Sequence, residues 1–146
     1  ASVSWIPEVE AASHADASFG KGCSFVSVAS GVAGKRLVLS STGPLTRDFD
    51  DPRNVFEAAK AGIARAVQAG STRPLVFLDD TIATVSEEYR EAPLVVLLGA
   101  LDACYSTIQT REFKGAEAAE PVTDLGLYVR ETDVAEVDAV IVKAVA

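Results

Sequence analysis

The 146-residue sequence contains no methionine, only one histidine and only two cysteines. The single histidine, His14, lies in a polar stretch far from either cysteine, and a zinc site or a histidine-based triad would need partners at a spacing that the chain does not show. Cys23 and Cys104 have no CxxC spacing, which favours two reduced thiols over a disulfide framework. The sequence therefore predicts no catalytic and no metal-binding residues of these kinds.

Long apolar runs are also missing. No run approaches the eighteen or so residues that span a bilayer, and the first residues lack a basic region followed by an apolar one. With two reduced thiols, this pattern predicts a cytoplasmic protein with no membrane partner.

Positive charge is scarce: the sequence has 13 basic and 21 acidic residues, which gives a formal net charge of -8. A phosphate backbone is repelled by such a surface, and the basic residues are interleaved with acids instead of clustered. A nucleic-acid partner is therefore not expected. The hydrophobic content of 49% in a chain of this length predicts one folded core without disulfides or metal.

One stretch, Arg36 to Asp80, has a complete strand, helix and strand pattern. Apolar runs at 37–39 and 75–78 predict strands covered on both faces of a sheet. Asp51 and Pro52 predict the N-cap and first residue of the helix between them, and Gly70 its end. The helix has one apolar stripe, formed by Val55, Phe56, Ala59, Ile63, Ala66 and Val67.

Two strands joined by such a helix are expected to be parallel, with a right-handed crossover. The predicted fold class is therefore α/β, with a mixed, largely parallel sheet flanked by helices.

The other predicted elements follow from similar signals, and three parts of the chain are distinguished. Residues 1–22 form an amino-terminal segment, residues 23–132 the α/β domain, and residues 133–146 a closing helix. In chain order we expect a short helix within Pro7–Ala17, a strand at Cys23–Ala29 in a hairpin with Arg36–Ser41, a polar connection with a helical turn at Thr81–Ala92, a buried helix at Pro93–Tyr105, a loop at Lys114–Asp124 and a strand at Leu125–Val129. The closing helix has a capping-box pattern at Asp133 and Glu136, and it reaches Ala146 without a stop signal, so more protein is expected to follow.

The loop from Ser40 to Asp48 is the candidate ligand site, because open α/β sheets bind ligands at the carboxyl ends of their strands. Thr42, Gly43 and Arg47 are its candidate residues, and a phosphate is the ligand they suggest. Neither GxGxxG nor GxxxxGK[ST] is present, however, and acids at the helix start would repel an anion. The alternative interpretation is a turn followed by helix-capping acids.

The same acids, Asp48, Asp50 and Asp51, could instead form a metal site or a general acid and base pair, with Asp79 and Asp80 joining them. Hard cations need several converging oxygens, but acids at a helix start are what capping and the helix dipole favour on their own. No catalytic and no metal-binding residue is therefore assigned to this chain.

The order of motifs resembles the amino-terminal domain of the leucyl aminopeptidase family, the M17 metallopeptidases. The similarity covers roughly Cys23 to Ala146, although the family's domain normally begins with one more strand than residues 1–22 provide. The matching features are a strand ending in a glycine turn, an alanine-rich helix ending AxxAG, a helix with an LLGA core, and a tyrosine followed by a charged and aromatic pair. They correspond here to Gly43, to Ala66–Gly70, to Leu97–Ala100, and to Tyr105 with Glu112 and Phe113.

This resemblance implies a macro-domain-like fold that helps to build a homo-oligomer, a hexamer in the family. It also implies that two divalent metals, zinc or manganese, are bound by a carboxy-terminal catalytic domain whose NTDAEGRL-type motif is absent from this sequence. That catalytic domain would be the partner of the present chain. The expected function is that of a non-catalytic, oligomerising or regulatory domain of an enzyme that releases amino-terminal residues from peptides.

Two other functions stay open at this point. One is a stand-alone macro-like module that binds a nucleotide or ADP-ribose at the Thr42–Arg47 loop. The other is an inactive structural paralogue.

Overall fold

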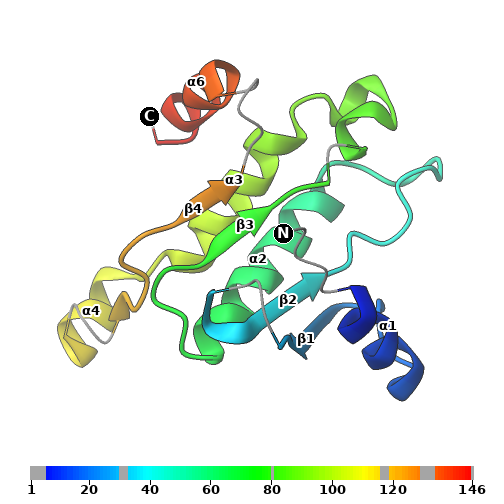
Figure 1. Cartoon of the computed structure of the whole chain (residues 1–146). Coiled ribbons are helices and arrows are strands. Elements are labelled where there is room, and N and C mark those ends of the chain that lie inside the picture. The colour runs from blue at the N-terminus through cyan, green and yellow to red at the C-terminus, as the bar shows by residue number, and fades with distance from the viewer. Residues whose placement is uncertain (1–5, 30–32, 80, 116–118, 129–133, 146) are drawn as a thin grey trace.

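The computed structural model describes residues 6–29, 33–79, 81–115, 119–128 and 134–145 (Figure 1). The elements in chain order are α1 (Ile6–Ala15), β1 (Cys23–Ser27), the 3-10 helix η1 (Ala33–Lys35), β2 (Arg36–Ser40), α2 (Arg53–Gln68), β3 (Leu75–Phe77), the 3-10 helices η2 (Ile82–Thr84) and η3 (Glu87–Tyr89), α3 (Ala92–Cys104), α4 (Ile108–Lys114), β4 (Gly126–Tyr128) and α6 (Val134–Val145). Helices and strands both contribute, and one strand pair is parallel, so the predicted α/β class is confirmed.

The first two strands form the predicted hairpin. They pair antiparallel from Cys23 opposite Ser40 to Ser27 opposite Arg36. The connection turns through Gly34 and Lys35, whose φ angles of 73° and 53° lie in the left-handed region that glycine enters most easily.

The predicted end of α2 is confirmed, and its start lies one residue beyond the predicted one, at Arg53 with Pro52 in the N-cap position. At its start, the Asp51 carboxylate accepts a hydrogen bond from the Arg53 backbone N–H at 2.7 Å, and Pro52 needs no partner for a missing N–H. At its end, Gly70 has a φ of 79° and donates to the Val67 carbonyl, while Ser71 donates to the Ala66 carbonyl. This pair of bonds is a Schellman motif, which satisfies carbonyls that the helix leaves free.

An arginine ties the hairpin to the end of this helix. The Arg36 guanidinium, on the first residue of β2, donates a hydrogen bond to the carbonyl oxygen of Ala69. A cation at a helix carboxyl end is favourable because it faces the negative end of the helix dipole. The contact joins residues that are 33 positions apart.

The helices α2 and α3 pack against each other through Gly99. A Cβ atom at Gly99 would lie 2.4 Å from the Phe56 carbonyl oxygen and 3.2 Å from the Ala59 Cβ atom, so only glycine allows this approach. Val55, Tyr89, Ala92 and Val96 form the buried cluster at this contact. The predicted helix at 93–105 is therefore confirmed, although Leu98 on it is exposed and the helix is not covered all round.

The strands differ from the predicted single sheet. β3 pairs parallel with β4, from Leu75 opposite Gly126 to Phe77 opposite Tyr128, while β2 pairs only with β1 among the described residues. β2 and β3 run in the same direction on one side of α2, as predicted, but they are not hydrogen-bonded to each other (Figure 1). β3 has three residues and follows Pro74, which has no N–H for a ladder bond.

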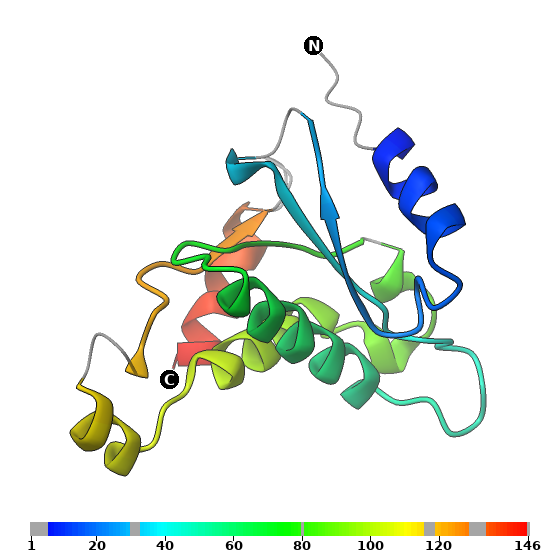
Figure 2. The same cartoon turned by 90° about the horizontal axis from the view of Figure 1, so that it is seen from below.

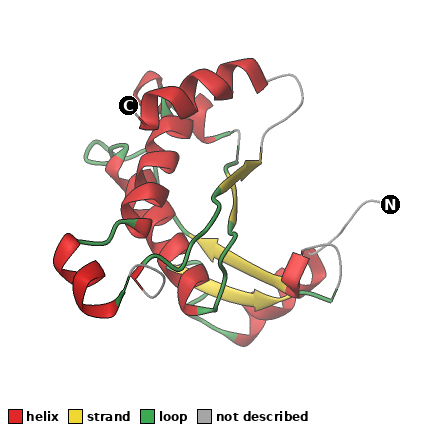
Figure 3. Ribbon diagram, turned by 90° about the vertical axis from the view of Figure 1, so that its left-hand side faces the viewer, coloured by secondary structure: helices red, strands yellow, loops and turns green. Residues whose placement is uncertain are grey.

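The layers are unequal on the two sides of the strands. Helices α2, α3 and α6 lie on one side, and α1 lies on the other side beside the hairpin (Figures 2 and 3). Leu75 and Phe77 are exposed, so the prediction that this strand is covered on both faces was wrong. The apolar run at 75–78 does not by itself say how many faces are covered.

The remaining predictions for helices had mixed outcomes. The helix in the amino-terminal segment is confirmed as α1, and helix α4 was not predicted. The predicted capping box begins at Asp133, outside the described residues.

Within the described part, no single helix is long and apolar enough to cross a membrane; α3 and α4 would reach that length and composition only as a pair bent by 43°.

Candidate functional site

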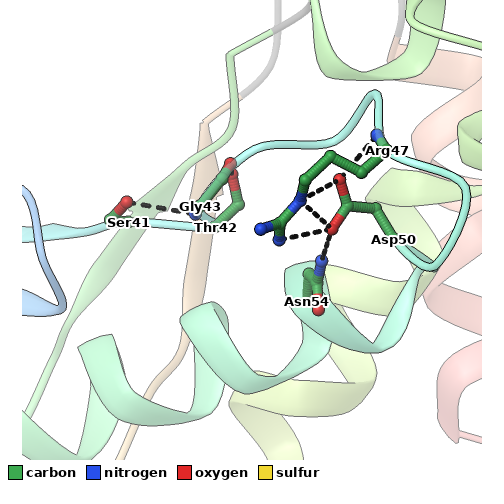
Figure 4. Close-up of polar contacts among 6 residues, drawn as sticks. All are labelled: Ser41, Thr42, Gly43, Arg47, Asp50 and Asn54. Atoms are coloured by element: carbon green, nitrogen blue, oxygen red, sulfur yellow. Dashed lines mark hydrogen bonds and ion pairs between the residues drawn. The ribbon is translucent and has the colours of Figure 1, made fainter.

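The candidate loop lies between the carboxyl end of β2 and the start of α2 (Figure 4). Its first part is a turn at Gly43, whose φ of 69° disfavours other residue types. The Gly43 N–H donates to the Ser41 hydroxyl at 3.1 Å, and the Thr42 hydroxyl donates to the Gly43 carbonyl at 3.0 Å. The Thr42 hydroxyl and the backbone N–H and carbonyl of Gly43 are therefore engaged within the turn.

The second part of the loop is closed by an ion pair between Arg47 and Asp50. The guanidinium nitrogens Nε and Nη2 lie 2.7 to 3.1 Å from the Asp50 carboxylate oxygens, and the Arg47 backbone N–H donates to the same carboxylate at 2.8 Å. The Asn54 amide adds a longer bond at 3.4 Å. Asp50 is buried, so this carboxylate is paired inside the loop instead of being available to a ligand.

The ion pair also favours the charged forms of both side chains. The hydrogen bond from Arg47 lowers the pKa of Asp50, against the opposing effect of burial, and the hydrogen bond to Asp50 raises the pKa of Arg47. The Arg47 guanidinium lies 4.3 Å from the centre of the exposed Phe49 ring, which is a cation–π contact. Within the described loop, no hydrogen bond joins Arg47 to Thr42 or Gly43.

The acids proposed as an alternative metal site do not converge. Asp50 is held by Arg47, Asp51 caps α2, and the Asp79 carboxylate accepts from the N–H and the hydroxyl of Thr81 at 2.9 and 2.8 Å. Both bonds lower the pKa of Asp79, and the bond from the backbone N–H has the larger effect. Asp80 lies outside the described residues. Where the structure describes the chain, no three His, Cys, Asp or Glu side chains are placed to hold a metal ion, so these residues do not fit one.

The histidine and the thiols lie apart from this loop. His14 Nδ1 is 2.9 Å from the Glu10 carbonyl oxygen within α1. Cys23 and Cys104 are free and half-buried, and burial raises the pKa of both thiols. A raised pKa leaves a thiol protonated and poorly nucleophilic at neutral pH.

Asp50 was given a different role from the sequence, and Tyr89 was not singled out at all. Asp50 was grouped with the helix-capping acids, although its spacing of three from Arg47 was a visible signal for the ion pair. Tyr89 is buried in the cluster beneath the loop, and its hydroxyl has no hydrogen-bond partner in the described structure. Burial, and then the nearby Asp50 charge, raise the pKa of Tyr89. Its position in an acidic connection gave no sign of this burial.

Comparison with known proteins gives one informative similarity. No protein-family model and no solved structure matches the chain. The chain is 38% identical over 92 residues to a Caenorhabditis elegans protein named "Putative aminopeptidase W07G4.4". The match covers 63% of this chain and 16% of that protein, so the chain spans about a sixth of the length of its relative. Over most of its own length, the chain is therefore similar to an aminopeptidase-related protein.

Proposed function

We propose that this chain is the non-catalytic amino-terminal domain of a metal-dependent leucyl aminopeptidase of the M17 family. The observation that carries the proposal is the 38% identity to a protein named as an aminopeptidase, of which the match spans only 16%. The order of motifs from Gly43 to Phe113 resembles the same family.

The geometry of the candidate loop supports a structural role for this domain. Its arginine is paired with a buried carboxylate, its glycine shapes a turn, and one of its acids caps α2. In the proposed enzyme, two zinc or manganese ions in the carboxy-terminal part would activate water and polarise the scissile carbonyl. The residues described here contribute the scaffold of a cytoplasmic homo-oligomer, a hexamer by resemblance, and none of them carries a reaction step.

The test compares the 146-residue chain with the polypeptide that its gene encodes. Leucine release from a leucyl peptide is measured for both, with added zinc or manganese and again with a chelator. We expect the encoded polypeptide to be active, the chelator to abolish the activity, and the 146-residue chain to be inactive. Stoichiometric metal binding and amino-acid release by the 146-residue chain would contradict the proposal.

The two alternative functions give different results in the same set of experiments. Calorimetric titration of the chain with ADP-ribose would show saturable micromolar binding for a nucleotide-binding module. That binding would disappear in Gly43→Val, with circular dichroism confirming that the variant is folded. An inactive structural paralogue would instead form an oligomer without peptidase activity.

A further inference from the structure

The outer face of the β3–β4 pair exposes three large apolar side chains. We define the outer face by Leu75, Phe77 and Tyr128, whose exposed fractions are 68%, 62% and 54%. The rings of Phe77 and Tyr128 lie 5.5 Å apart between centroids and are tilted by 54°. The Leu75 side chain lies over Gly126, where an added Cβ atom would be 2.9 Å from Leu75 Cδ1. The three side chains therefore form one apolar surface across both strands.

The opposite face of the same strand is covered. Val76 and Leu78 pack against the buried cluster that contains Val55 and Tyr89. Parallel strands are normally covered on both faces, and a two-stranded sheet alone is marginally stable in water. Among the described residues, nothing gives the outer face the cover that parallel strands usually have.

A polar contact borders this apolar surface at the start of both strands. Arg73 Nε lies 3.1 Å from the Asp124 carboxylate, and both side chains are largely exposed. Next to them, the Thr123 N–H donates to the Thr72 carbonyl at 2.8 Å. An apolar centre with aromatic residues and a polar rim is the usual composition of a protein interface.

The size of the outer face indicates what kind of partner covers it. Exposure of over half of three large side chains corresponds to roughly 350 Å² of surface. A stable complex between separate chains buries about 800 Å² on each partner. Interfaces between domains of one polypeptide begin at about 600 Å² in total, or roughly 300 Å² on each side. Domains in one chain need less contact because the linker gives them a high effective concentration.

We propose that the outer face is the docking surface for the remaining, catalytic part of the same polypeptide. This inference rests on the proposed function, because it takes the chain to be one domain of a longer enzyme. The aligned relative, of which the match spans 16%, has ample length for such a second part. Phe77 and Tyr128 would be the central contacts, and Arg73 and Asp124 would lie at the rim.

Hydrogen exchange of backbone amides tests the proposal. The exchange rates of residues 75–77 and 126–128 are measured in the 146-residue chain and in the polypeptide that the gene encodes. We expect at least tenfold slower exchange in the encoded polypeptide, and loss of that difference in Phe77→Ser. The matched control is Phe113→Ser on α4, which removes a more exposed phenylalanine outside the outer face and is expected to leave the difference unchanged.

The other outcomes distinguish a failure of the docking surface from a failure of the proposed function. Equal exchange rates in the two polypeptides would overturn the docking surface, whereas metal-dependent peptidase activity in the longer one would leave the proposed function standing. A dimer of the 146-residue chain that Phe77→Ser dissociates, measured by light scattering, would overturn it in favour of a second copy. A gene that encodes no further domain would overturn both proposals.

Discussion

The α2–α3 contact and the β3–β4 pair show two very different degrees of closure within one chain. Between the helices, the backbone of Gly99 approaches the Phe56 carbonyl so closely that no side chain fits. On the strands, Leu75, Phe77 and Tyr128 face solvent. Among the described residues, α2 and α3 are packed closely against each other, while the β3–β4 pair is covered on one face only.

The difference shows that apolar character alone does not say where a core lies. Val76 and Phe77 are neighbours in one apolar run, but Val76 packs on the buried cluster and Phe77 does not. Alternation along a strand places adjacent side chains on opposite faces. Val76 therefore stabilises this fold, while Phe77 is available to a partner.

The largest expected effect comes from closing the space at Gly99. Gly99→Ala is expected to lower the free energy of unfolding by about 2 kcal/mol, because the new methyl group would overlap the Phe56 carbonyl. Chemical denaturation measures this change. The matched control is Gly62→Ala in α2, whose Cβ atom would meet Ser40 Cβ at 3.3 Å and whose effect should stay within about 1 kcal/mol of zero. Equal losses at both positions would contradict the close approach.

The next effect compares the two faces of β3. Val76→Ser is expected to lower the free energy of unfolding by about 1.5 kcal/mol, because it removes apolar contact with the buried cluster. Phe77→Ser should cost less than about 1 kcal/mol in the 146-residue chain, since it loses mainly the Tyr128 ring contact. Thermal denaturation of both variants checks the order. A larger loss for Phe77→Ser would mean that the outer face is covered within this chain.

The third effect has the opposite sign. Tyr89→Phe is expected to raise the free energy of unfolding by about 1 kcal/mol, because it removes a buried hydroxyl that has no partner in the described structure. Tyr128→Phe removes an exposed hydroxyl and should change stability by less than about 0.5 kcal/mol. Destabilisation by Tyr89→Phe would indicate that the hydroxyl is hydrogen-bonded after all.

The smallest effect concerns the stability of the fold at low pH. The pKa of Asp50 is lowered in the folded chain, so the Arg47 pair stabilises the fold above the unfolded pKa of about 3.9 and loses this effect as the pH falls through the folded value. Asp50→Asn should therefore flatten the loss of stability below about pH 4. Urea unfolding at several pH values measures the slope, with Asp48→Asn as the charge control. An unchanged slope in Asp50→Asn would rule out this contribution.

Local signals were sufficient for several elements. The Asp51 carboxylate and Gly70 set the ends of α2, and the turn at Gly34 and Lys35 closes the hairpin, because each of these effects involves residues that are close in sequence. Helix α4 was missed although Thr107, whose side chain accepts from the Thr110 N–H, is an ordinary N-cap.

Properties set by distant residues could not be predicted in this way. The pairing of β3 with β4, and the exposure of Phe77, depend on how segments about fifty residues apart meet. The candidate loop was located correctly at the end of β2. The pairing of Arg47 with Asp50 inside this loop depends on the direction of the Arg47 side chain, which a sequence does not specify. Whether Thr42, Gly43 and Arg47 bind a ligand stays a prediction for the titration described above.

The bond from Arg36 to the Ala69 carbonyl has a consequence for the order in which the chain opens. It connects the first residue of β2 with the end of α2, so the hairpin and the helix cannot separate without breaking it. Segments joined in this way often unfold as one cooperative unit. Because α2 also packs closely against α3 at Gly99, the hairpin, α2 and α3 are expected to open together as such a unit.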